Sequence, residues 1–360
     1  MKRKLALGPT GWGVATSGLL ALLAAMYFLW PAGATHYWTP SDLLHTPPAA
    51  LHADALDKVQ ELARGLGRQP VALAVEPPGS IYAGSLVVAY TSGNVVRLSA
   101  DGSQFEALGN TGGWPFAVAL TLNGDLFVAD ARRGLLKLDG GHFVQLYDGQ
   151  NVEGVAVSRT GTKIYFTRWS RHFSWQQIGA ARFAHDESGT LMSYDTKTGQ
   201  VKRIAGGLSL PRGVVSGPKG DYVLVAESGN YRIVRVWLDG TNTGRKAVFA
   251  SGLPGFPDGI SFNGFDRFWV AVPTQRIPEL DQLAHRSIYR RFLLRLPRGF
   301  RPRIRPVHKP CVLSFDLAGH RIAELRGEGA SVVAPAYGPV NVAVESGPWL
   351  WLGSEARKAV

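Results

Sequence analysis

The feature that most restricts the fold is a repeat of short apolar segments that runs from Pro70 to the end of the chain. Each unit has a segment of small and branched residues, a polar turn and an aromatic-rich segment. The first segments cover 71–75, 116–120, 154–157, 213–215, 259–262 and 342–344, and the second cover 80–84, 125–130, 163–167, 222–226, 267–271 and 349–353. Residues of these types between turns predict β-strands.

Six such units predict an all-β fold, a six-bladed β-propeller, because radial repetition buries both faces of every sheet. The last unit stops at Val360, soon after its second strand. We therefore expect the segment around 54–66 to supply its missing outer strand. Two units carry insertions, 168–187 in the third and 275–309 in the fifth. The predicted propeller domain takes residues 53–360.

The first 34 residues predict a membrane anchor. Lys2, Arg3 and Lys4 precede Trp12–Trp30, which holds no charged residue and is about long enough to cross a bilayer as a transmembrane helix. No Lys or Arg follows until Lys58, which predicts a cytoplasmic N-terminus and a propeller outside the cytoplasm. Residues 35–52 are interpreted as a linker. The alternative is a signal peptide cleaved after Ala32-Gly33-Ala34, which gives a secreted protein.

The net charge of +12 is concentrated in two places. Lys2–Lys4 is one, and Arg276–Lys309, with ten Lys or Arg against Glu279 and Asp281, is the other. The rest of the chain is near neutral, which argues against a nucleic-acid partner. The second insertion has apolar residues near helical spacing at Ile277, Leu280, Ala284, Ile288, Phe292 and Leu296. Such a basic amphipathic helix suits a membrane surface, and a helix that caps the propeller is the alternative.

One stretch in the fourth and fifth units resembles a known family. The residues are Val225-Ala226-Glu227-Ser228, Tyr231–Arg235, Trp237–Gly240 and Leu253–Ile260. They are similar to the signature of the strictosidine synthase-like propellers, with Gly259 where that family has Asn. The resemblance implies a small-molecule hydrolase of the arylesterase or lactonase type. A non-catalytic binding propeller is the alternative, so whether the chain is an enzyme stays open here.

Related propellers, the gluconolactonases and paraoxonases, hold calcium in the central tunnel. Carried over by position, the resemblance puts Val71 or Ala72 where those proteins have Glu, and Glu153 and Arg212 where they have Asn. Asp258 matches the family's Asp, and Phe116 replaces a paraoxonase histidine. Oxygen ligands are what Ca²⁺ requires, and Arg212 brings a cation instead. We therefore expect no cofactor; Glu153 and Asp258 are the ligands if calcium is bound after all.

The candidate site combines these positions with residues of the first insertion. The predicted catalytic residues are Glu153, Asp258 and His172, and the predicted substrate-binding residues are Arg212, Arg168, Trp169 and Trp114. His172 is included because the pKa of an unperturbed imidazole lies near neutrality. The glutamate that strictosidine synthase uses falls near Val342, so that reaction is not expected. The expected partners are a membrane and a small-molecule ligand, and the oligomeric state stays open.

Overall fold

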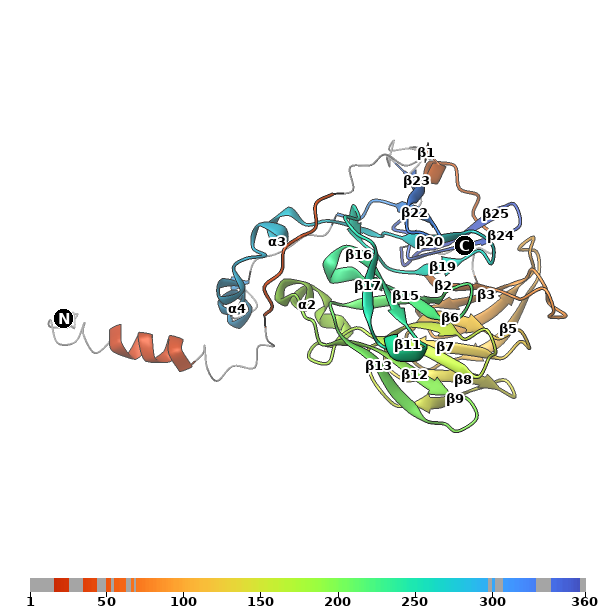
Figure 1. Ribbon diagram of the computed structural model, residues 1–360, viewed down its shortest axis with the longest axis horizontal. Coiled ribbons are helices and arrows are strands. Elements are labelled where there is room, and N and C mark those ends of the chain that lie inside the picture. Colours follow the sequence, from red (N-terminus) through yellow and green to blue (C-terminus); the bar gives the residue numbers. More distant parts are fainter. Residues whose placement is uncertain are drawn as a thin grey trace, which may run out of the picture.

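The computed structural model describes residues 16–25, 35–43, 50–52, 55–62, 66–67, 69–296, 300–301, 307–327 and 338–356. Its main body is an all-β propeller whose sheets radiate from a central axis (Figure 1). In each four-stranded sheet, consecutive antiparallel strands run outward from the axis in chain order. The strands are short and joined mainly by tight turns, as the repeat in the sequence predicts.

Among the described residues, five sheets have four or more strands. The first sheet consists of β2 (Pro70–Val75), β3 (Leu86–Tyr90), β4 (Asn94–Leu98) and β5 (Phe105–Asn110), and the second of β6 (Pro115–Leu120), β7 (Leu126–Asp130), β8 (Gly134–Asp139) and β9 (His142–Tyr147). The third consists of β10 (Val152–Val157), β11 (Lys163–Arg168), β12 (Gly189–Asp195) and β13 (Val201–Leu208), and the fourth of β14 (Pro211–Ser216), β15 (Tyr222–Glu227), β16 (Arg232–Trp237) and β17 (Lys246–Ala250). The fifth consists of β19 (Ile260–Phe262), β20 (Arg267–Ala271), β22 (Cys311–Asp316) and β23 (Arg321–Arg326), to which β1 (Ala50–His52) is added. A hairpin of β24 (Val342–Ser346) and β25 (Trp349–Gly353) follows.

The ring closes through this hairpin, because β24 contacts both β19 and β2. We call β2, β6, β10, β14, β19 and β24 the inner strands, since each is the first strand of its sheet and contacts the next one around the axis. The sheets pack on one another through apolar side chains. Between the first two sheets, for example, Val87 and Ala89 share a buried cluster with Val128 and Leu136. This packing fixes the inner strands around a central space.

Two sequence-based expectations about strands are wrong. The second strand of the first unit is Leu86–Tyr90, while residues 80–84 form turns in which Ile81 is exposed. The outer strand expected around 54–66 is absent from the described residues there, where Ala55–Asp57 form a 3₁₀ helix. Instead, β1 pairs in parallel with β23 and adds a fifth strand to the fifth sheet. The N-terminal part of the chain therefore extends a different sheet from the one predicted.

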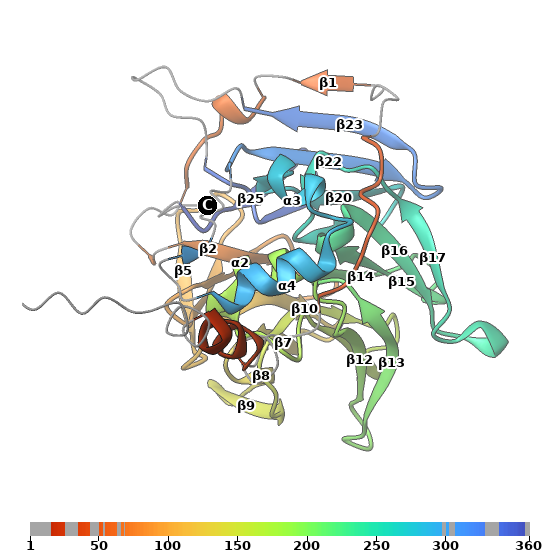
Figure 2. The same cartoon turned by 90° about the vertical axis from the view of Figure 1, so that its left-hand side faces the viewer.

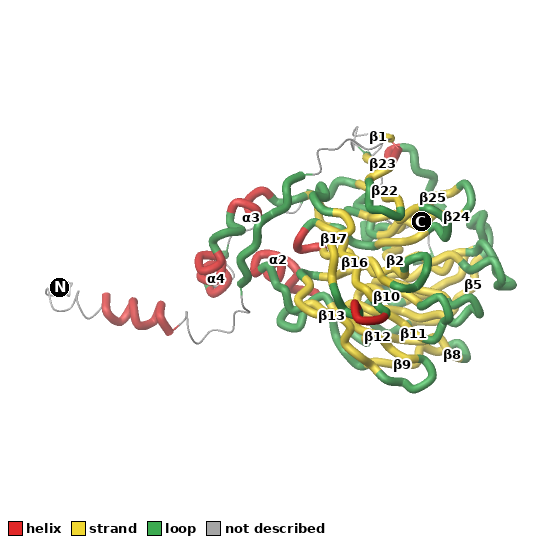
Figure 3. Tube along the Cα trace, viewed as in Figure 1, coloured by secondary structure: helices red, strands yellow, loops and turns green. Residues whose placement is uncertain are grey.

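Both insertions place helices on the same face of the propeller, at the end where the inner strands begin (Figures 2 and 3). The first holds a 3₁₀ turn (Trp175–Gln177) and α2 (Ile178–Ala184), and the second holds α3 (Pro278–Gln282) and α4 (Ser287–Arg295). A two-stranded sheet of β18 (Gly255–Phe256) and β21 (Thr274–Gln275) precedes α3, and further 3₁₀ turns occupy Ser228–Asn230 and Gly240–Asn242. α2 packs directly against α4.

Residues 35–43, interpreted above as part of a linker, lie against these helices. The backbone N–H of His36 donates to the carbonyl of Ala184, and the Thr35 hydroxyl donates to the carbonyl of Ser287. We call residues 35–43 the strap. Residues 16–25 form a helix away from the propeller, and the rest of the predicted membrane span lies outside the described residues. No helix within the described ranges is both long and apolar enough to cross a membrane.

Candidate functional site

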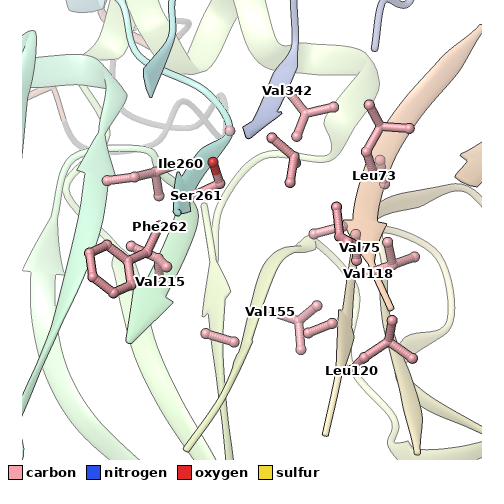
Figure 4. Close-up of a pocket in the computed structure, with 18 of the residues that line it drawn as sticks. Leu73, Val75, Val118, Leu120, Val155, Val215, Ile260, Ser261, Phe262 and Val342 are labelled. Carbon is pink, nitrogen blue, oxygen red and sulfur yellow. The ribbon is translucent and has the colours of Figure 1, made fainter. Parts of the chain in front are cut away.

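A cavity of about 950 Å³ runs along the propeller axis between the inner strands. Most of its wall is aliphatic: Figure 4 shows Val75, Val118 and Val155 projecting into it from three neighbouring inner strands. Where the inner strands end, exposed Leu122 and Phe265 border the cavity. We call this end the mouth, because the cavity meets solvent there.

The opposite end of the cavity, where the inner strands begin, is charged. Arg212 on β14 stands between two carboxylates, with its Nη2 atom 2.8 Å from Oε1 of Glu153 and its Nε atom 2.9 Å from Oδ1 of Asp258. The three side chains are only 5–12% exposed. Carboxylates removed from water need compensating charge, and the guanidinium supplies it to both at once.

Asn341, just before β24, completes this end of the cavity. Its Nδ2 atom donates to Oδ2 of Asp258 at 3.0 Å, so both oxygens of that carboxylate have partners. Its own Oδ1 accepts a hydrogen bond from the backbone N–H of Glu355 at 2.9 Å. The Asp258 carboxylate is therefore held in one orientation from two sides.

Irregularities in the inner strands aim these side chains at the axis. The pairing of β10 with β11 shifts register between Val152 and Val155, and that of β14 with β15 shifts between Pro211 and Val214. Glu153 and Arg212 lie inside these two bulges. A bulge turns the strand locally and redirects its side chains, and bulges are frequent next to functional sites.

A glycine follows each of the three charged residues. Neighbouring inner strands approach so closely here that a Cβ on Gly154, Gly213 or Gly259 would collide with a backbone carbonyl of the next strand. The carbonyls belong to Arg212, Asp258 and Asn341 in turn. At Gly259, where the resembling family has Asn, the neighbouring strand of this chain leaves no room for a side chain.

Burial changes the acid–base properties of Glu153. Desolvation raises the pKa of its carboxyl to about 7, although the Arg212 guanidinium acts in the opposite direction. Its Oε2 atom is buried and has no hydrogen-bond partner among the described residues. Glu153 is thus a carboxyl that titrates near neutrality and has one oxygen without a hydrogen-bond partner among the described residues. A pKa near neutrality is what a general acid–base residue needs.

A second cation, Arg182 on α2, belongs to the same environment. The pKa of its guanidinium is lowered to about 10, mainly by burial and also by the nearby charge of Arg212, while Asp258 acts in the opposite direction. Its guanidinium lies 4.2 Å from the ring centroid of Phe256. In Arg212 the attraction of Asp258 and Glu153 outweighs the desolvation that opposes its charge, and the pKa is raised. Both arginines are therefore cationic at neutral pH.

The sequence of the chain is similar to those of several known proteins. A family model described as strictosidine synthase matches residues 153–241. Adipocyte plasma membrane-associated protein from Rattus norvegicus is 33% identical over 201 residues, which is 52% of this chain and 54% of that protein. Protein strictosidine synthase-like 6 from Arabidopsis thaliana is 28% identical over 318 residues, 85% of this chain and 82% of that protein. This chain is similar to the strictosidine synthase-like proteins.

The alignment with the rat adipocyte protein spans about half the length of that relative. Among solved structures, this chain is similar to a gluconolactonase from Xanthomonas campestris, with a TM-score of 0.55 and 16% identity over 90% of this chain and 98% of that one. It is also similar to regucalcin from Agrobacterium tumefaciens, described as a calcium-binding protein, with a TM-score of 0.52 and 14% identity over 84% of each chain. At these identities the likeness concerns the fold alone.

The residues at the charged end do not fit a calcium ion. Two carboxylates face this end, and each already pairs with the Arg212 guanidinium. Calcium takes six to eight oxygen ligands, which the apolar wall around this end does not offer. Nor does any cluster of three or more His, Cys, Asp or Glu suited to a metal occur in the described part of the chain. The guanidinium takes the central position between the carboxylates.

Four of the seven residues predicted for the site do not line the cavity. Trp169 is fully buried in a hydrophobic cluster, and Trp114 lies against Trp175 with ring centroids 4.2 Å apart. Arg168 donates to the carbonyl of Gln150. His172 is half exposed on the first insertion, with Nδ1 3.0 Å from Oδ1 of Asp186. These four side chains are held away from the cavity by these contacts, whereas Arg182 of the same insertion lies close enough to Arg212 and Asp258 to be affected by their charges.

Asn341 and Arg182 belong to the site and were missed. For Asn341 a signal was present, because it directly precedes an inner strand, as Glu153 and Asp258 stand near the starts of theirs. For Arg182 there was none, since its position depends on how α2 folds back over the propeller. The structure brings together Glu153, Arg212 and Asp258 from three different sheets.

Proposed function

We propose that this protein is a small-molecule hydrolase that cleaves apolar esters or lactones in the central cavity without a metal ion, and that it is attached to a membrane. The observation that carries the proposal is Glu153, whose pKa is raised to about 7 at the end of an apolar cavity. A general base is most effective when its pKa lies near the working pH.

The chemistry assigns one role to each charged residue. The ionised Glu153 carboxylate takes a proton from a water molecule in the cavity, and the resulting hydroxide adds to the substrate carbonyl carbon. The Arg212 guanidinium, fixed by Glu153 and Asp258, faces the negative charge that develops on the carbonyl oxygen. When the C–O bond breaks, the alkoxide leaving group takes the proton back from Glu153. Asn341 positions Asp258 and through it Arg212.

The substrate class follows from the wall of the cavity. A volume of about 950 Å³ with an aliphatic lining suits an aryl or medium-chain acyl group, since ligand sites gain most of their affinity from apolar contact. The gluconolactonase among the structural neighbours has the same fold, and its name adds the lactone class to those worth testing.

Turnover of a panel of aryl esters and lactones by the full chain, with and without calcium and in the presence of a chelator, tests the proposal. We expect hydrolysis that is independent of calcium and falls at least about 100-fold in Glu153→Gln, as expected for loss of a general base. The matched control is Glu324→Gln, which alters a buried carboxylate paired with Arg321 and Arg326 outside the cavity. Equal activity in Glu153→Gln, or activity only with calcium, would contradict the proposal.

A non-catalytic binding protein is the second candidate. The observation that favours it is the mutual neutralisation of Glu153, Arg212 and Asp258, which would also stabilise the end of a purely apolar binding cavity. In that case the panel gives no turnover, while an apolar fluorophore binds in the cavity and is displaced by the same esters. Replacing Val155 in the cavity wall with Asp should then abolish binding.

We also propose that the β24–β25 hairpin is the inner half of a sixth blade. Its position between β19 and β2 and the contact of β25 with β2 support this assignment. The membrane attachment is supported by the uncharged Trp12–Trp30 and by the similarity to adipocyte plasma membrane-associated protein. Flotation of the full chain with vesicles after a salt wash tests the attachment, and recovery in the soluble fraction would contradict it.

A further inference from the structure

The second insertion leaves one face of α4 without a partner in the fold. The apolar residues expected to form one stripe divide between two environments: Leu280 and Ala284 are buried, whereas Ile288 is 70% and Phe292 is 40% exposed. Tyr289 is also exposed. A reverse turn between α3 and α4 breaks the helical period, so that the stripe of α4 faces outward.

The inner face of α4 is anchored to the propeller. Leu293 and Leu294 belong to the same buried cluster as Phe183 of α2. Arg290 is fully buried, and its guanidinium donates to the carbonyls of Leu283, Phe183 and His36. The outward face therefore does not result from a loosely attached helix. It is held in place from beneath by a buried cation.

The same contacts determine where the N-terminal segment leaves the propeller. Arg290 binds the strap at His36 and lies 4.4 Å from the ring centroid of Trp38. One residue earlier, the Thr35 hydroxyl donates to the carbonyl of Ser287, at the first residue of α4. Exposed Tyr37 contacts His285 in the turn before α4, with ring centroids 4.8 Å apart. The strap therefore begins at the first turn of α4.

The charges next to this face are predominantly positive. Arg286 is exposed, and Arg291 and Arg295 are half-buried on the flank of the Ile288–Phe292 stripe. Glu279 of α3 is the exposed carboxylate nearest in sequence. An apolar stripe with arginines along its edge is the pattern of helices that lie in the interface of an anionic bilayer.

We propose that the outward face of α4, together with Tyr37 of the strap, lies on the surface of an anionic lipid bilayer. This fixes the orientation of the propeller: the helical face rests on the membrane, and the mouth of the cavity faces the water. The mouth is at the opposite ends of the inner strands, where Leu122 and Phe265 are exposed. Substrates therefore reach Glu153 from the aqueous side. The proposal rests on the membrane attachment proposed above.

Site-specific labelling of the full chain on vesicles of phosphatidylcholine and phosphatidylserine tests this orientation. Cysteines are introduced singly in Ile288→Cys and Phe292→Cys on α4, and in Ile81→Cys and Phe265→Cys at or near the mouth. Each carries an environment-sensitive fluorophore. The native Cys311 is buried and burial raises the pKa of its thiol to about 12, so it stays unlabelled under mild conditions.

We expect the labels at 288 and 292 to be quenched by lipids with a quencher on the acyl chain, and the labels at 81 and 265 to be quenched by aqueous iodide alone. Arg291→Gln combined with Arg295→Gln should abolish the preference of the α4 labels for vesicles with phosphatidylserine over phosphatidylcholine alone. Lipid quenching at 81 or 265 would overturn the orientation.

Two further results would also overturn the inference. If the labels at 288 and 292 are shielded from iodide but not quenched by lipid, the face binds protein, either a partner or a second copy of the chain. If the full chain does not float with vesicles at all, the membrane attachment itself fails as well. Ester turnover is measured in parallel, so that loss of membrane contact is distinguished from loss of the hydrolase.

Discussion

The guanidinium Nη2 atom of Arg212 lies 2.8 Å from Oε1 of Glu153, across the boundary between the third and fourth sheets of the propeller. The same guanidinium reaches Asp258, just before the fifth sheet, so one side chain connects three blades at the axis. Because these buried charges both connect the blades and line the cavity, a change in any of them should alter the stability of the propeller as well as the charge in its cavity.

Arg212→Ala should destabilise the protein by about 3–5 kcal/mol, because it leaves two buried carboxylates without a cation. Urea unfolding followed by tryptophan fluorescence measures the change. The control is Lys137→Ala, which removes a partly exposed pair with Asp125 at 2.8 Å and should cost at most about 1 kcal/mol. Similar losses in the two variants would show that Arg212 does not stabilise the buried carboxylates.

The pKa of Glu153 predicts how stability changes with pH. Its folded pKa of about 7 lies above the ordinary value of 4.5, so the folded state binds the proton more tightly than the unfolded state. The stabilisation from this proton is fully present below pH 4.5 and is lost as the pH rises through about 7. The difference in unfolding free energy between the unmodified protein and Glu153→Gln should therefore fall over this range. A difference that is constant or rises with pH would contradict the raised pKa.

The same titration predicts the pH dependence of catalysis. A general base acts only when ionised, so kcat/KM for an aryl ester should increase as the pH rises toward about 7 and then level off. Glu324→Gln should retain this profile. A profile without a transition near neutrality, measured over a range in which the protein stays folded, would exclude Glu153 as the base.

Gly213→Ala should destabilise the protein by about 1–3 kcal/mol, because the added methyl group collides with the backbone of Asp258 and Ile260 on the next inner strand. Gly79→Ala is the control, since the space around Gly79 is open, and it should change stability by less than about 0.5 kcal/mol. Thermal melting of the two variants measures the contrast. Equal melting temperatures would show that the inner strands are farther apart at Gly213 than they are in the structure.

Much of this architecture was predictable from local pattern. The alternation in Phe116–Leu120 and the aromatic run in Arg267–Ala271 determine strands almost by themselves, and both are strands in the structure. The segment 80–84 was misassigned because its Ile81-Tyr82 pair has strand-like residues, yet the Pro77-Pro78-Gly79 sequence before it makes a turn and leaves Ile81 exposed. Local composition does not say which apolar residues stay in solvent.

The site was predictable where a residue's position in a strand decided its direction. Glu153, Arg212 and Asp258 precede equivalent glycines, and the propeller geometry brings them to one axis. His172 and Trp169 could not be placed in this way, because they belong to an insertion whose path depends on its packing with α2 and α4. Arg290 belongs to the second, basic insertion, and its burial depends on long-range contacts with the strap that no local pattern reveals.

Calcium provides the most direct test of the central claim that a guanidinium occupies the centre of the charged end. The measurement is metal analysis of the purified protein, followed by melting with and without a chelator. We expect no stoichiometric calcium and an unchanged melting temperature, and we expect added calcium to restore part of the stability lost in Arg212→Ala. Stoichiometric calcium in the unmodified protein, with melting lowered by the chelator, would show that Arg212 does not stand between Glu153 and Asp258.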